Sequence, residues 1–172
     1  QAASSAPTRV PVDPANPGPV GPSYYDVAGV TDATDGTNPL LRFARFVARL
    51  RREEPALRQA AWGGLLGTNA APYRFRRPDL ADAPAEGDRA LAVLIGGPDA
   101  PGGEYLLAVN MWTEPLAFAL PEGRWARLVD TAPWAEAQAN CWRPDDAAQY
   151  GAGGYTVEPW SCALLRAVRS SA

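Results

Sequence analysis

The sequence is 172 residues long, its hydrophobic fraction is 47%, and its 16 basic and 19 acidic residues give a formal net charge of -3. These values are typical of one compact globular domain, and without a block of like charges they exclude a surface suited to a nucleic-acid backbone. The sequence contains no His, which removes the commonest general base and the commonest neutral metal ligand.

The first segment, residues 1–37, is dominated at its start by Pro, Ala, Ser and Gly. Its repeated prolines break any helix or central strand, so the segment predicts a linker followed by a loop. The apolar run of a signal peptide is missing here, and a start at Gln1 favours a processed or excised piece.

The strongest local pattern predicts an amphipathic helix in residues 38–61, with Thr37 or Asn38 as the N-cap, Pro39 in the first turn and Pro55 closing the pattern. The residues that form its apolar face are Leu40, Leu41, Phe43, Ala44, Phe46, Val47 and Leu50. Four arginines, Arg42, Arg45, Arg49 and Arg52, line the opposite side as a stripe typical of a solvated face. So wide an apolar face needs a large partner surface, and we expect the isolated chain to expose it or to bury it against another copy.

Residues 62–89 are interpreted as a connection and residues 90–172 as a β-sandwich domain, because short apolar runs there alternate with turn signals. The expected strands are Ala90–Ile95, Tyr105–Met111, Leu116–Leu120, Trp125–Val129, Tyr155–Val157 and Ser161–Val168. No helical pattern separates them, which favours antiparallel pairing, and the first two strands are apolar enough to be buried on both faces. The predicted fold class is therefore mainly β, an antiparallel β-sandwich preceded by one amphipathic helix.

No catalytic constellation emerges from the sequence. The carboxylates considered for glycoside hydrolysis, Asp130, Asp145, Asp146 and Glu158, lie at strand ends or in turns, and we interpret them as solvated. Ser161 has neither the Gly-x-Ser-x-Gly elbow nor a His to activate it, and the glycines form no phosphate-binding fingerprint. We expect no catalytic residue, no metal and no cofactor in this chain.

The two cysteines, Cys141 and Cys162, are too few and too far apart for a metal knuckle. They form either two thiols or one disulfide, and we favour free thiols because nothing indicates a cysteine-stapled secreted scaffold. No stretch approaches the roughly 20 apolar residues that a membrane span needs. We expect a soluble protein with neither membrane nor nucleic acid as partner.

Six tryptophans are many for this length, and flat aromatic faces can stack on sugar rings. We predict that Trp125 and Trp160 begin strands and pack inward, and that Trp112, Trp134 and Trp142 lie at the ends of the sandwich. These last three are the candidate glucan-binding residues, although packing is the commoner role for each of them.

The string AVNMWTEPLAFALPEGRWARLVDTAPW, residues 108–134, resembles the C-terminal domain of isoamylase-type and GlgX-type debranching enzymes of the α-amylase superfamily. The matching positions are Asn110, Trp112, Glu114, Pro115, Phe118, Leu120, Pro121, Trp125, Leu128, Val129, Asp130 and Thr131. The ending YTVEPWSCALLRA is similar to the family's last strand. The helix NPLLRFARFVARLRREEPALR is similar to its final barrel helix, with Glu54-Pro55 in place of His-Pro.

The resemblance covers roughly residues 38–167 and implies a parent enzyme that hydrolyses α-1,6-glucosidic branch linkages in starch or glycogen. It places the catalytic acids on barrel strands that this chain does not contain, so no catalytic residue is carried over. The expected partner is the catalytic barrel of the parent, and the expected compartment is the plastid stroma or the bacterial cytoplasm.

Two alternatives stay open. The parent resembles the non-catalytic isoamylase subunit of plastids in its LVDTA stretch and its Ser161-Cys162 pair, in which case the partner is a catalytic isoamylase subunit and the role is regulatory. The other alternative is an independent module that binds α-glucan through Trp112, Trp134 or Trp142.

Overall fold

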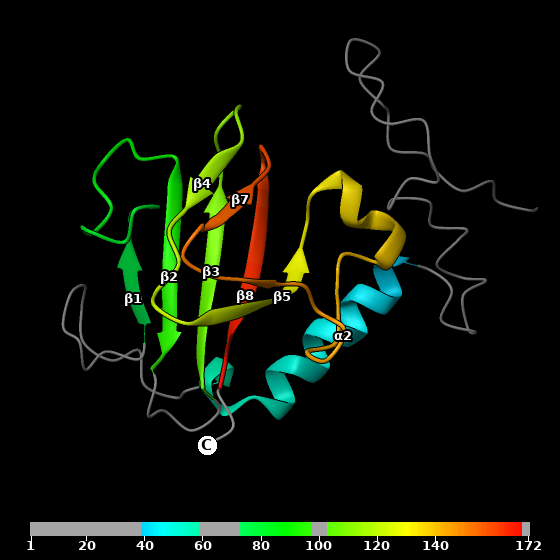
Figure 1. Cartoon of the computed structure of the whole chain (residues 1–172). Coiled ribbons are helices and arrows are strands. Elements are labelled where there is room, and N and C mark those ends of the chain that lie inside the picture. The colour runs from blue at the N-terminus through cyan, green and yellow to red at the C-terminus, as the bar shows by residue number, and fades with distance from the viewer. Residues whose placement is uncertain (1–38, 59–72, 98–102, 170–172) are drawn as a thin grey trace, which may run out of the picture.

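The computed structural model describes residues 39–58, 73–97 and 103–169. In this part of the chain, a six-stranded antiparallel sheet, a two-stranded antiparallel sheet and one α-helix make up the fold (Figure 1). The predicted fold class, a mainly β antiparallel sandwich preceded by one helix, is confirmed.

The larger sheet contains six strands. Their spatial order is β1 (Tyr73–Arg76), β2 (Ala90–Gly96), β3 (Glu104–Asn110), β8 (Ser161–Val168), β5 (Arg124–Asp130) and β6 (Gln149–Tyr150). The smaller sheet pairs β4 (Leu116–Phe118) with β7 (Tyr155–Val157) and lies in front of β3 and β8 in Figure 1. All six predicted strands are present within two residues of their expected ends.

Strands β1 and β6 were not expected from the sequence. The β1 residues YRFR carry two arginines, so the segment has little apolar signal of its own, and β6 is two residues long. Strand β1 forms by pairing along β2, from Tyr73 opposite Ile95 to Arg76 opposite Ala92. Long-range pairing of this kind decides where an edge strand forms more than local composition does.

The two faces of the larger sheet are covered by different elements. Alternate residues of each strand point to opposite faces, and β2 accordingly sends Ala92 and Leu94 to one core cluster and Val93 and Ile95 to the other. The first cluster also contains Leu106, Ala108, Phe118, Trp125, Tyr155, Val157, Ala163 and Leu165, and β4 and β7 cover it. The second contains Leu50, Ala56, Tyr105, Ala126, Leu128 and Ala147, so the helical segment covers the other face.

Helix α2 (Pro39–Glu53) ends just before Pro55, as predicted, and the short 3₁₀ helix η2 (Pro55–Arg58) follows it. Leu50 is buried and Phe46 packs against the second cluster, so the sheet itself covers part of the apolar face. The expectation that this face would need an absent partner is therefore wrong for these two residues. Leu40 and Val47 are each 38% exposed, and for them a partner stays a prediction. None of the helices in the described residues is both long enough and apolar enough to cross a lipid bilayer.

One end of the sandwich collects most of the polar and aromatic residues that the sequence singled out. Strands β3 and β5 both pair antiparallel with β8, so both finish where β8 begins, with Asn110 opposite Ser161 and Asp130 opposite Ala163. The 3₁₀ helix η3 (Pro133–Gln138) continues from β5 at this end. Cys141 and Cys162 are both free, which agrees with the thiol prediction.

Candidate functional site

The side chains of α2 divide into three groups around the helix axis. Successive residues are rotated by about 100°, which places Phe46 and Leu50 on the side packed against the sheet. Arg42 and Arg49 then occupy one flank, and Leu40 and Val47 the other. The helix therefore presents an arginine flank and a separate, partly exposed apolar flank.

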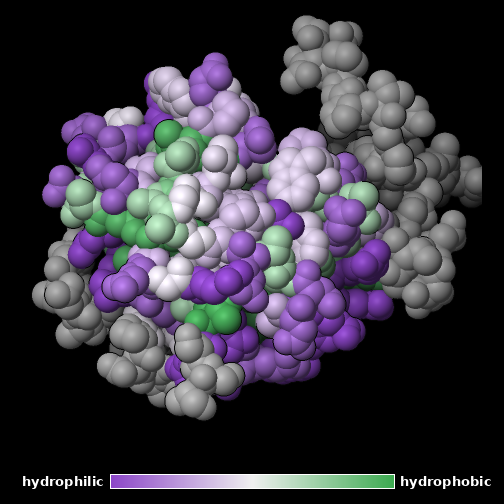
Figure 2. Space-filling view, viewed as in Figure 1, coloured by the Kyte–Doolittle hydropathy of each residue, from purple (hydrophilic) through white to green (hydrophobic). Residues whose placement is uncertain are grey.

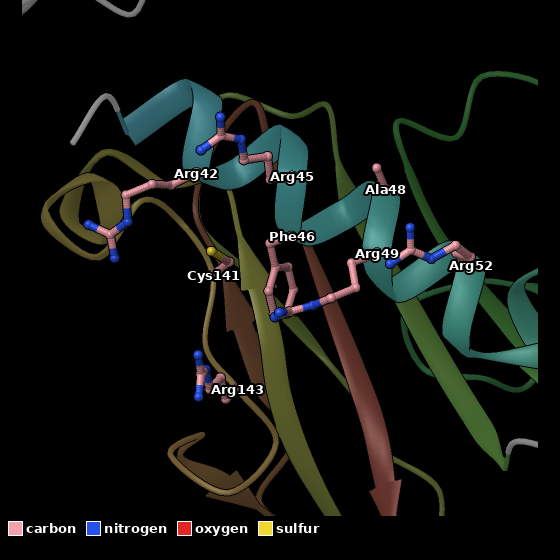
Figure 3. Close-up of a pocket in the computed structure, with 8 residues that line it drawn as sticks. All are labelled: Arg42, Arg45, Phe46, Ala48, Arg49, Arg52, Cys141 and Arg143. Atoms are coloured by element: carbon pink, nitrogen blue, oxygen red, sulfur yellow. The ribbon is translucent and has the colours of Figure 1, made fainter. Parts of the chain in front are cut away.

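A cavity of about 580 Å³ lies between the arginine flank and the segment that follows η3 (Figure 3). The residues that line it are Arg42, Arg45, Phe46, Ala48, Arg49, Arg52, Cys141 and Arg143. In Figure 3, Arg42 and Arg49 extend from α2 toward the segment that carries Cys141 and Arg143. We call this space the arginine cavity.

The arginine cavity is strongly positive although the chain has a net charge of -3. Glu53 lies 3.9 Å from Arg49 Nε and 3.8 Å from Arg52 Nη2, and these exposed ion pairs are weak. Among the described residues, no acidic side chain forms an ion pair with Arg42, Arg45 or Arg143. On the face seen in Figure 2, hydrophilic residues predominate where α2 and the segment after η3 lie.

Cys141 lies at the wall of this cavity. Burial raises the pKa of the Cys141 thiol, and the positive charges of Arg42 and Arg49 act in the opposite direction. The thiol is thus kept protonated by its surroundings and is not an activated nucleophile. The chemistry that the arginine cavity offers is charge and hydrogen-bond donation.

Two of the three candidate glucan-binding tryptophans lie together. The ring centres of Trp134 and Trp142 are 5.9 Å apart with an interplanar angle of 31°. The guanidinium carbon of Arg127 lies 3.9 Å from the centre of the Trp142 ring and 4.6 Å from that of Trp134. A cation placed over an aromatic face is attracted to it, so Arg127 fixes both rings.

The two rings of this pair differ in exposure. Trp142 packs against the second core cluster, whereas Trp134 is 49% exposed. Only Trp134 therefore presents a large open surface. Arg127 itself is buried; its Nη1 donates a hydrogen bond to the Tyr150 hydroxyl at 3.1 Å, and its Nε has no hydrogen-bond partner among the described residues.

The third candidate, Trp112, lies just past the end of β3, and its ring contacts Arg89 instead of the other two tryptophans. It is 41% exposed, and the guanidinium carbon of Arg89 lies 4.8 Å from its ring centre. The structure thus brings Trp134 and Trp142 together and leaves Trp112 as a separate exposed ring. No pattern in the sequence indicated Arg127 or Arg89, because these cation–ring contacts join residues far apart in the chain that only the tertiary fold brings together.

The prediction for Trp125 and Trp160 is half right. Trp125 is 1% exposed, and its Nε1 donates a hydrogen bond to the carbonyl of Pro121 at 2.9 Å. Trp160 is 62% exposed and has a φ of 54°, so the prediction that it packs inward is wrong. The left-handed backbone just before β8 turns this side chain away from the core.

Asn110 ties the two sheets together at the end of β3. The side chain is fully buried, and its Nδ2 donates hydrogen bonds to the carbonyls of Glu114, Val157 and Glu158 at 2.9, 3.0 and 3.2 Å. Its Oδ1 accepts a hydrogen bond from the Trp112 N–H at 2.9 Å. One amide thereby satisfies backbone groups of two segments, the turn after β3 and the end of β7.

Asp130 plays the corresponding part at the end of β5. It is 1% exposed, so its interpretation as a solvated carboxylate is wrong: β7 covers it. Its Oδ2 accepts a hydrogen bond from the Tyr155 hydroxyl, and its Oδ1 accepts one from the Ala132 N–H at 2.8 Å. Burial, and then the contact with Asp130, raise the pKa of Tyr155. Asp145 and Asp146 are exposed, as predicted, and Glu158 is half-buried.

At the end of the sandwich where β3 and β5 finish, these hydrogen bonds join strands of the domain to one another. Next to Asp130, the Thr131 Oγ1 accepts a hydrogen bond from the Cys162 N–H at 2.8 Å, which joins β5 to β8. The described residues contain no group of three or more His, Cys, Asp or Glu side chains that could hold a metal ion.

No protein-family model matches the chain, and no curated protein matches it. Among solved structures, the trehalulose synthase MutB from Pseudomonas mesoacidophila MX-45 is 23% identical with a TM-score of 0.40, over 74% of this chain and 18% of that chain. A MutB variant in complex with glucose is 23% identical with a TM-score of 0.43, over 74% of this chain and 18% of that chain. A MutB variant in complex with Tris is 22% identical with a TM-score of 0.44, over 79% of this chain and 20% of that chain.

The chain thus spans about a fifth of the length of the solved structures it matches. Identities and TM-scores at this level assign neither a family nor an activity.

Proposed function

We propose that this chain is the C-terminal, non-catalytic portion of an isoamylase-type debranching enzyme of the α-amylase superfamily. Its parent would hydrolyse α-1,6-glucosidic branch linkages in starch or glycogen. The chain would cover and stabilise the catalytic barrel.

The observation that carries the proposal is where the polar side chains of residues 108–134 form their hydrogen bonds. Asn110, Asp130 and Thr131 direct their hydrogen bonds to the domain's own backbone and to Tyr155. Polar side chains whose hydrogen bonds all go to the domain's own strands are expected of a supporting domain. Such side chains have no hydrogen-bonding group left for catalysis.

The apolar flank of α2 supports a partner on the side away from the sheet. Leu40 and Val47 remain 38% exposed while Leu50 on the same helix is buried. In the proposed parent, this helix is the last of the barrel, and the barrel covers that flank. Burial of apolar side chains there would contribute about 25 cal/mol for each Å² removed from water.

A reconstitution experiment tests this role. The chain is mixed with an isoamylase-type catalytic barrel that lacks its own last helix and C-terminal domain, and the thermal half-life of debranching activity on amylopectin is measured. We expect the chain to prolong the half-life and Val47→Asp to abolish the effect. Val168→Asp is the matched control, because Val168 is 37% exposed but lies at the end of β8.

The chain alone should not release reducing ends from pullulan or amylopectin. Turnover above contaminant level would refute the non-catalytic assignment, and an unchanged barrel half-life would refute the supporting role. If the natural barrel partner lacks its catalytic acids, the same docking serves a regulatory subunit.

A glucan-binding module is the second candidate, favoured by the exposed Trp134 ring fixed by Arg127. Affinity electrophoresis in glycogen gels tests it, with Trp134→Ala and Trp112→Ala as variants. Trp160→Ala is the control, since that ring is exposed but is not one of the candidates. A wild-type band that runs unretarded would end this candidate.

A further inference from the structure

We propose that the arginine cavity binds a small organic phosphate, a phosphate monoester whose anionic group is held by guanidinium groups from both walls. This goes beyond the supporting role proposed above and does not depend on it.

The number and kind of the charges indicate a phosphate. Five of the chain's 16 basic residues line this one cavity. The planar guanidinium fork of Arg matches phosphate oxygens bidentately, and several cations are needed around a dianion. The cavity takes four of its arginines from α2 and Arg143 from the facing segment, so both walls supply donors, and Arg42 and Arg49 extend toward the wall that carries Arg143 (Figure 3).

Without an anion, repulsion among the four helix arginines is offset only by the weak ion pairs of Glu53 with Arg49 and Arg52. Arg42, Arg45, Arg49 and Arg52 follow one another at spacings of three and four residues, and each such like-charge contact destabilises a helix by roughly 0.2–0.5 kcal/mol. Arg42 also lies in the first turn, where the helix dipole disfavours a cation, and that turn contains no acidic residue. A bound anion removes both penalties.

The size and lining of the cavity indicate an organic ligand. Its volume of about 580 Å³ falls within the range of small-molecule sites. Phe46 and Ala48 add apolar surface to the wall, which the carbon part of a phosphate ester can contact. The apolar flank with Leu40 and Val47 lies on the other side of α2, so a docked barrel and a bound phosphate do not compete for the same surface.

Isothermal titration calorimetry of the full chain at constant ionic strength tests the proposal, with glucose 6-phosphate, inorganic phosphate and glucose as probes. We expect saturable binding of the ester, weaker binding of inorganic phosphate and none of glucose. Arg42→Gln and Arg143→Gln, one from each wall, should each weaken ester binding about tenfold, the effect of one lost charge-assisted contact. Arg124→Gln removes the same charge from the exposed start of β5 and should leave binding unchanged.

Thermal unfolding gives a second readout that a folding defect cannot imitate. Without ligand, Arg42→Gln should unfold at the same temperature as the wild type or higher, because it relieves repulsion. With the ester, the wild type should gain stability and the variant should gain less.

Three results would overturn the proposal. They are no saturable binding of the ester, equal weakening by Arg124→Gln, and binding of inorganic phosphate as tight as that of the ester. These measurements contain no barrel, so a negative result does not bear on the supporting role. In the same way, a negative reconstitution experiment does not bear on the phosphate site.

Discussion

Glu54 and Arg166 form an ion pair, with Oε1 and Nη1 3.2 Å apart, that joins the end of α2 to strand β8. The Glu54 side chain is 16% exposed and that of Arg166 is 32% exposed, so water screens the pair only in part. This contact and the burial of Leu50 explain how the helix stays on the sheet face.

We predict that Glu54→Gln lowers the free energy of unfolding by about 1 kcal/mol, at the upper end of the range for exposed pairs because this one is partly buried. Urea unfolding at low and high salt measures the change. A double-mutant cycle with Arg166→Gln should show that most of the loss is shared between the two residues. Additive losses would mean that the ion pair does not stabilise the helix.

Gly154→Ala should destabilise the domain strongly. Gly154 has a φ of 76°, and an added Cβ would lie 2.5 Å from the carbonyl oxygen of Phe118 on the neighbouring strand. Left-handed backbone and overpacking together predict a loss of roughly 2 to 4 kcal/mol in urea unfolding. Gly153→Ala is the matched control, because a Cβ there meets nothing within 4 Å. Similar losses for both variants would refute the argument.

Asn110→Ala should cost roughly 2 to 4 kcal/mol, because the buried carbonyl of Val157 and the part-buried carbonyls of Glu114 and Glu158 lose their donor. Urea unfolding checks this value. Gln138→Ala, which removes an exposed amide from η3, should change the stability little. A small loss for Asn110→Ala would show that water replaces the lost donor.

Stability should fall as the pH rises above about 10. Burial raises the pKa of Tyr105 and of Tyr155 above the ordinary value of 10.0. The unfolded chain therefore loses these protons first, the folded chain binds more protons there, and rising pH favours unfolding. Their stabilising effect is fully present below pH 10.

The urea midpoint measured between pH 8 and pH 11, alongside tyrosinate absorbance, checks this expectation about the two buried tyrosines. Tyr155→Phe should flatten the decline above pH 10, even though it lowers stability at neutral pH by removing the hydrogen bond to Asp130. An unaltered slope would show that Tyr155 titrates no differently in the folded and unfolded chains.

Most of the helices and strands could be predicted from the amino-acid sequence. The periodicity of α2, its end before Pro55 and the six apolar strands follow from side-chain spacing and turn residues, which are local properties. The expected burial of both faces of β2 and β3 was also correct, because strands without polar alternation have no face suited to water.

Which residues contact one another depends on the folded chain. Asp130 was expected in solvent and is buried, and Trp160 was expected inside and is exposed, because both side chains lie at strand ends. There, backbone conformation and the covering strand β7 set the direction. The arginine stripe was visible in the helical spacing, but Arg143 faces it only because the segment after η3 folds back beside α2. A one-dimensional pattern contains no information about such contacts between distant segments.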